Sequence, residues 1–91
     1  MEAMFENNIN LEILKLDNFN TEKVKFMSSM FSGLVSLKTL DVSKFITNEV
    51  VDMSFMFDNC QSLMILDVSK FVTKKVEYMN HMFNTVRMLL I

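Results

Sequence analysis

The sequence predicts an α/β solenoid of about three and a half 26-residue repeats, with a parallel sheet on one side and short helices on the other. Two observations carry this prediction. The dipeptide Met-Phe recurs at a constant step along the chain, and every unit divides into a strand-like half followed by a helix-like half. A unit of this size cannot bury its apolar side alone, so neighbouring units have to stack. The dipeptide stands at Met4-Phe5, Met30-Phe31, Met56-Phe57 and Met82-Phe83.

The whole chain, residues 1–91, is interpreted as one repeat domain. Ninety-one residues leave room for a single core, and the repeat continues from one unit to the next without a linker. The copies run over roughly 1–10, 11–36, 37–62, 63–88 and 89–91, of which the first and the last are partial.

The first half of each unit has the pattern of a short strand. Its apolar residues follow the order Leu-x-x-Leu-x-Leu/Val, and the last two of them, two positions apart, share one face of a strand. Strands are expected near 11–16, 37–42 and 63–68. Stacking would align them in a parallel sheet with a spacing of about 4.8 Å.

The second half of each unit has the pattern of a short helix. Its apolar residues are spaced by three, three and one, which traces one stripe of a helix. Helices are expected near 22–31, 48–57 and 74–83, with Thr21, Thr47 and Thr73 placed as N-caps. The Met and Phe columns keep this spacing, so we interpret them as core rather than as a ligand groove.

Composition argues against several functional classes. Apolar residues make up 51% of the chain against 22% charged, which excludes a disordered protein. One cysteine excludes a disulfide framework and makes a structural zinc site a poor interpretation. The net charge of −2 and the absence of a basic stripe argue against nucleic acid as a partner. No apolar run approaches the ~18–20 residues that span a bilayer, and the first residues do not resemble a secretory signal.

The repeat resembles a known family. Its strand pattern is similar to that of leucine-rich repeats, and the full unit, L-D-V-S-K-F-x-T-x-x-V-x-x-M-x-x-M-F, resembles the BspA-type leucine-rich repeat surface proteins. Residues 40–57 and 66–83 match this unit almost end to end, and residues 14–31 match it with substitutions such as Lys15 and Asp17. The resemblance covers essentially the whole chain. It implies a leucine-rich repeat solenoid that contacts proteins of a host or a neighbouring cell.

Outward-facing strand positions form the one surface that the repeat forces into register, and solenoids commonly bind partners on such a face. Asp41 and Asp67 would lie one strand apart, where like charges repel. Solvent, a lysine, a cation or a basic group of a partner would each relieve that repulsion, although two carboxylates alone are a poor cation cage. Apolar residues on this face favour a protein or peptide partner. The candidate partner-binding residues are Glu12, Ile13, Lys15, Lys38, Thr39, Asp41, Met64, Ile65 and Asp67.

No catalytic, cofactor or metal site is expected. His81 is the only histidine and has no catalytic partners in its repeat, so we interpret it as a half-exposed surface residue. Cys60 is interpreted as a small buried thiol. The sequence contains no Ser/His/Asp or Cys/His arrangement, no glycine-rich phosphate loop and no metal-ligand spacing.

We therefore expect a non-enzymatic interaction or adhesion module of a repeat-containing surface protein. Neither end of the chain carries a polar cap, which favours a fragment of a longer array and also allows end-to-end self-association. The alternative is an intracellular structural or assembly module that stacks through these uncapped ends. The family resemblance implies a cell-surface or extracellular location, and a cytoplasmic one stays open because the chain shows no signal peptide.

Overall fold

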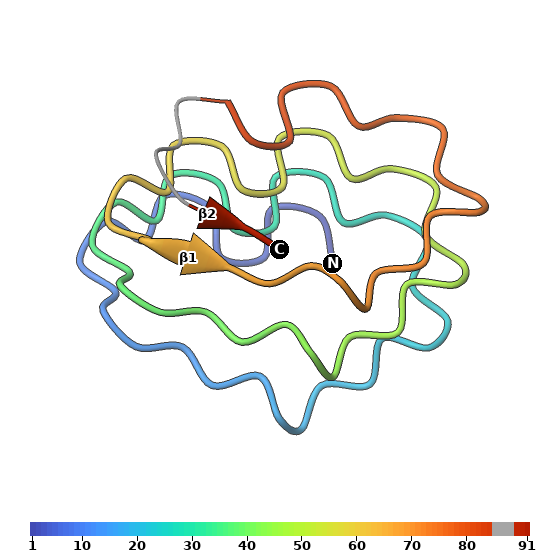
Figure 1. Ribbon diagram of the computed structural model, residues 1–91, viewed down its shortest axis with the longest axis horizontal. Coiled ribbons are helices and arrows are strands. Elements are labelled where there is room, and N and C mark those ends of the chain that lie inside the picture. The colour runs from blue at the N-terminus through green and yellow to red at the C-terminus, as the bar shows by residue number, and fades with distance from the viewer. Residues whose placement is uncertain (85–88) are drawn as a thin grey trace.

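The chain winds into coils that lie one above another, as the colour order from blue to red shows in Figure 1. The computed structural model describes residues 1–84 and 89–91, and it extends over 30 × 27 × 23 Å. Equivalent residues of consecutive repeats lie on successive coils, so that Phe26 pairs with Asp52 and Asp52 with Tyr78 in isolated parallel bridges. The coils, rather than regular elements, are the units of this structure.

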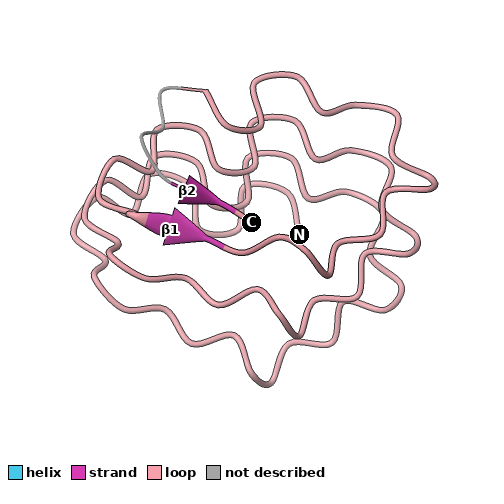
Figure 2. Cartoon of the chain, viewed as in Figure 1, coloured by secondary structure: helices cyan, strands magenta, loops and turns pink. Residues whose placement is uncertain are grey.

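The expected α/β architecture is wrong. Within residues 1–84 and 89–91 there is no helix, and the only strands are β1, Ile65–Leu66, and β2, Leu89–Leu90. These two pair in parallel, with Ile65 opposite Leu89 and Leu66 opposite Leu90. Figure 2 shows the rest of the described chain as loops and turns. The molecule is therefore not a leucine-rich repeat solenoid with a continuous sheet on one side and helices on the other.

Hydrogen bonds between coils replace the helices expected at 22–31, 48–57 and 74–83. Alternate N–H groups donate to a carbonyl of the next coil, as from Phe31 to Met56 over 3.0 Å. The intervening N–H groups close tight turns, as from Ser32 to Ser29 over 3.1 Å. An α-helix needs each N–H to bond four residues back. Because alternate N–H groups here bond to carbonyls of the next coil, these segments cannot form helices. We call the resulting run of tight turns the turn ribbon.

Among the described residues, left-handed backbone conformations recur at two positions of the repeat. One column comprises Ala3, Ser29, Phe55 and His81, with φ between 53° and 58°, and the other comprises Asn7, Gly33 and Asn59, with φ between 60° and 75°. Asparagine and glycine tolerate this region best. The only glycine of the chain stands in the second column, where a Cβ would collide with Oδ1 of Asn7. The recurrence of Asn and Gly at equivalent positions of the repeat was the sequence signal for a turn.

Two of the three threonines expected to cap helices, Thr21 and Thr47, bond to the next coil instead. The hydroxyl of Thr21 donates to the carbonyl of Ile46 over 3.0 Å and accepts from its N–H over 2.8 Å. Thr47 repeats this pair of bonds with Val72, over 2.9 and 2.7 Å. Both threonines are buried. The N-cap expectation is wrong, because each hydroxyl satisfies backbone groups of the next coil rather than those of its own segment.

Two columns of phenylalanine rings fill the space between the coils. The rings of Phe5, Phe31, Phe57 and Phe83 stack with centroid distances of 5.9, 5.6 and 5.7 Å and interplanar angles of no more than 10°. The second column, Phe19, Phe45 and Phe71, packs beside the first, and the ring of Phe45 lies 6.0 Å from that of Phe31. Aromatic pairs at such distances contribute roughly 0.5–1.5 kcal/mol beyond the burial of their area.

The interpretation of the Met and Phe columns as core is confirmed for the central coils. Met27, Met30, Phe31, Met53, Met56 and Phe57 have no exposed surface. Members of the first and last coils are more open, with Met4 46% and Met79 47% exposed. No helix in the described residues is long and apolar enough to cross a membrane.

The structure predicts that Phe45→Ala lowers the free energy of unfolding by about 3–5 kcal/mol, because the substitution leaves a cavity between the two ring columns. Urea unfolding followed by tyrosine fluorescence measures this loss. Phe45→Leu keeps most of the volume and serves as the control, with a smaller cost. Equal unfolding midpoints for the native chain and Phe45→Ala would contradict the stacked-ring core.

We also expect Thr47→Val to lower the free energy of unfolding by about 1–3 kcal/mol, because the buried N–H and C=O of Val72 lose their partner. The shape of the side chain hardly changes. Thr73→Val is the matched control. Thr73 is exposed, and in the described structure its hydroxyl makes no hydrogen bond to another coil. A Thr47 variant that unfolds at the same urea concentration as this control would show that the hydroxyl bonds are dispensable.

Candidate functional site

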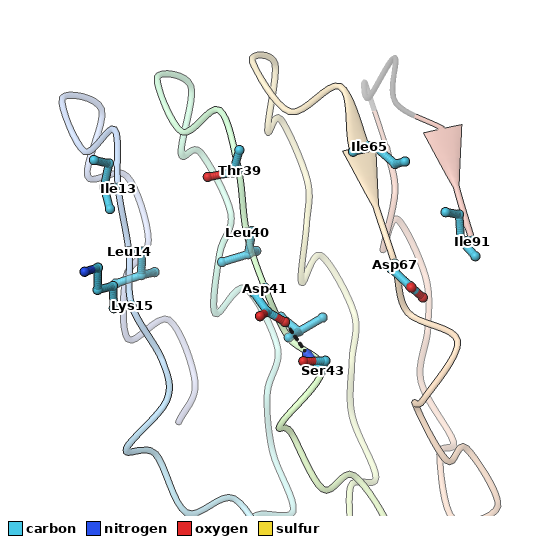
Figure 3. A pocket seen from close by; sticks show the side chains of 11 residues that line it. Ile13, Leu14, Lys15, Thr39, Leu40, Asp41, Ser43, Ile65, Asp67 and Ile91 are labelled. Carbon is cyan, nitrogen blue, oxygen red and sulfur yellow. Dashed lines mark hydrogen bonds between the residues drawn. The ribbon is translucent and has the colours of Figure 1, made fainter.

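A hollow of about 520 Å³ lies on the side of the coils formed by the expected strands. Figure 3 shows segments of successive coils running side by side beneath it, with side chains projecting from each. Leu40 and Val42, which are buried, line it from the core side, and exposed Ile13 and Ile65 line it from the surface. We call this hollow the groove. Its full lining is Ile13, Leu14, Lys15, Thr39, Leu40, Asp41, Val42, Ser43, Ile65, Asp67 and Ile91.

All nine side chains of the predicted partner-binding face are exposed. Six of them line the groove, namely Ile13, Lys15, Thr39, Asp41, Ile65 and Asp67, whereas Glu12, Lys38 and Met64 lie outside its lining. The sequence reasoning missed Leu14, Leu40, Val42, Ser43 and Ile91. Leu14 and Leu40 occupy equivalent positions of neighbouring repeats, where we expected one face of a strand.

Most of the described backbone segments beneath the groove form no hydrogen bonds to one another. Within the described residues, no backbone hydrogen bond joins segment 37–42 to segment 11–16 or to segment 63–68, although these were expected to be neighbouring strands. The last pair of coils does form such bonds, from Val68 to Ile91 over 2.8 Å and from Ile91 to Leu66 over 3.0 Å. The expectation of a continuous parallel sheet therefore holds only for the short pair of β1 and β2.

Two carboxylates stand in the groove at equivalent positions of neighbouring coils. Oδ1 of Asp41 accepts the backbone N–H of Ser43 over 2.9 Å, and Oδ1 of Asp67 accepts that of Ser69 over 2.9 Å. Each is an Asx-turn, in which the side chain bonds to its own backbone two residues on. The turn comes from the D-V-S sequence that both coils share, and it restrains each carboxylate.

Hydrogen bonds lower the pKa of both carboxyl groups. For Asp41 the donors are the hydroxyl and the N–H of Ser43, with a smaller contribution from the charge of Lys44. For Asp67 they are the same groups of Ser69, supported by Lys70. The charge of Asp41 raises the pKa of Asp67, but the hydrogen bonds outweigh it. Both groups are therefore ionised at neutral pH and repel one another as the sequence predicts.

The remaining groups with reactive chemistry lie elsewhere. The thiol of Cys60 is buried and donates to the carbonyl of Phe31 over 3.1 Å. Burial raises the pKa of this thiol to about 11, which keeps it protonated and a poor nucleophile. The imidazole of His81 is exposed and stacks on the ring of Phe55 at a centroid distance of 4.9 Å. Among the described residues no group of three or more His, Cys, Asp or Glu is placed to hold a metal ion.

The pKa of Asp41 predicts a specific response to acid. Because the folded pKa lies below the ordinary value of 3.8, the stabilisation is present above pH 3.8 and is lost as the pH falls through the folded pKa. Asp41→Asn keeps an oxygen acceptor for Ser43 but carries no charge, so its acid-induced loss of stability should be shallower than that of the native chain. Asp41→Ala removes the acceptor and should be less stable than Asp41→Asn at neutral pH. Urea midpoints from pH 7 to pH 2 test both statements, and identical pH dependence in all three chains would refute them.

Comparison with protein families places almost the whole chain in one of them. Residues 1–89 match the family described as "Mycoplasma protein of unknown function, DUF285". The comparison with curated proteins and the comparison with solved structures gave no match. The match includes every lining residue of the groove except Ile91. The chain belongs to the DUF285 family of Mycoplasma proteins.

Proposed function

We propose that this chain is a non-enzymatic protein-interaction or adhesion module of a repeat-containing surface protein of the BspA type. Membership of the DUF285 family is compatible with this role, and the resemblance of the repeat unit to BspA-type repeats supports it. In this proposal the groove side faces the partner, which is a protein of a host or a neighbouring cell.

The observation that carries the proposal is the exposure of large apolar side chains on the groove side. Ile13 is 70% exposed, Met64 75% and Ile65 49%, whereas Leu14, Leu63 and Leu66 of the same segments are buried or half-buried. Apolar side chains beside a groove are typical of interaction sites, where anchors enter a partner and lose contact with water. Exposed Lys15, Asp41 and Asp67 add polar groups at the same surface, as expected for the rim of an interface.

The proposed role requires no catalytic chemistry from the side chains in the groove. Asp41 and Asp67 are ionised and hydrogen-bonded, so neither is poised to donate a proton near neutral pH. Their part in binding is electrostatic, through the orientation and the specificity of a complex.

Binding to cells tests this proposal. Fluorescently labelled chain is titrated onto cultured animal cells, and the half-saturating concentration is measured by flow cytometry. The double variant Ile13→Thr with Ile65→Thr should bind about tenfold more weakly, because each change removes apolar area from the contact. Treatment of the cells with protease should abolish binding of the native chain, because the partner is a protein.

The matched control is the double variant Ile9→Thr with Ile46→Thr. These isoleucines are also exposed, 56% and 44%, but do not line the groove, so this variant should bind as the native chain does. The absence of saturable binding to any cell type, or equal losses in the two double variants, would refute the proposed function for this face.

A further inference from the structure

We infer that the groove binds an extended polypeptide segment in which a lysine or arginine lies two positions from an apolar residue. This inference rests on the proposed function, because it assigns the chemistry of the partner to the same face. Two features of the groove carry it: its charge and its apolar base.

The two carboxylates of the groove favour a cationic ligand. Asp41 and Asp67 project from neighbouring coils, and Figure 3 shows both over the segments that line the groove. Neither forms an ion pair within residues 1–84 and 89–91, where the ion pair present is that of Lys75 with Glu49 at 2.7 Å. A cationic side chain placed between the two carboxylates would relieve their repulsion and donate charge-assisted hydrogen bonds to both.

The two carboxylates are restrained before any partner arrives. Each is restrained by the N–H of the serine two residues on, Ser43 or Ser69. A carboxylate has about four lone-pair positions, so it can accept this bond and still bind an ammonium or a guanidinium group. Restraint of the free site lowers the entropic cost of binding. The turns therefore position the two charges for a ligand that presents its cation from above the groove.

Apolar contacts define the rest of the ligand. Beside the carboxylates lie Leu40, which is buried, and the exposed isoleucines Ile13 and Ile65. Residues two apart in an extended chain project to the same side, so a cation and an apolar residue at that spacing reach Asp41 and Leu40 together. The exposed isoleucines offer further apolar contact to such a segment.

An acidic peptide segment or a metal ion would fit the groove less well than a basic segment. An acidic segment would add a third negative charge beside Asp41 and Asp67. Lys15 is the only basic residue of the lining, while Lys44 and Lys70 lie outside it. A bare divalent cation would find two carboxylates where calcium sites have six to eight oxygen ligands. A basic peptide segment therefore fits the groove better than either.

Nuclear magnetic resonance of the full chain tests this inference. The probes are two blocked peptides, Arg-Ser-Val-Ser-Arg and Glu-Ser-Val-Ser-Glu, which differ only in charge. The arginine peptide should shift the amide signals of Thr39, Leu40 and Ile65 with a dissociation constant on the order of millimolar. The glutamate peptide should leave these signals in place. Binding should weaken in about 1 M salt, where the screening length is about 3 Å.

Variants separate local charge from net charge. Asp41→Asn with Asp67→Asn keeps the acceptor of both turns and should weaken the arginine peptide about fivefold. The control, Glu22→Gln with Glu77→Gln, removes the same net charge at exposed positions outside the groove and should leave the affinity unchanged. Asp41→Lys with Asp67→Lys should reverse the preference in favour of the glutamate peptide, a gain that a merely unfolded variant cannot show.

Three results would overturn the inference. They are equal shifts with both peptides, shifts of the arginine peptide that avoid residues 39–43 and 65–67, and saturable calcium binding that displaces the arginine peptide. If cells bind the chain through Ile13 and Ile65 but the peptides fail, the inference is wrong and the proposed function stands. If the arginine peptide binds in the groove and no cell binds the chain, the proposed function is wrong and the chemistry inferred for the groove stands.

Discussion

The bond from a backbone N–H of one coil to a carbonyl of the next is the interaction on which the rest of the structure depends. It recurs at every second residue of the turn ribbon, from Ala3 to Ser28 through Asn59 to Asn84. Each donor bonds the residue just before its own equivalent on the next coil, as Phe31 bonds Met56 rather than Phe57, and this constant offset keeps the coils in register. The ring columns and the Met columns are consequences of this register. Equivalent side chains of consecutive repeats are brought above one another, where Phe31 stacks between Phe5 and Phe57.

These inter-coil bonds join the backbones on one side of the coils and are largely missing from the described residues on the other side. Along the turn ribbon, backbone bonds and the hydroxyls of Thr21 and Thr47 join each coil to the next. On the groove side, segments 11–16 and 37–42 have no such bonds to one another among the described residues. Stability in this molecule therefore resides in the ribbon and the core, which leaves the groove side free to present polar and apolar groups to a partner.

The apolar columns could be recognised from the sequence, but their secondary structure could not. Spacings of three, three and one fit a helical stripe, and they fit equally a ribbon of tight turns with recurring left-handed residues. Local spacing cannot distinguish the two, because the difference lies in where the N–H groups bond. Thr21 and Thr47 illustrate this, since a hydroxyl suited to cap a helix was used to bond the next coil. The column of Asn7, Gly33 and Asn59 carried the information that favoured turns.

The constant repeat step, the positions that point inward and the exposed face with Asp41 and Asp67 were all readable from residue order alone, because each is a property of periodicity. The partners of the backbone groups were decided only by the tertiary structure. A backbone N–H carries no sequence identity, and it bonds whichever acceptor the stacked coils bring within reach. That choice turned expected helices into a ladder between coils. It also left the expected sheet open over most of its width, on the side of the coils where the groove lies.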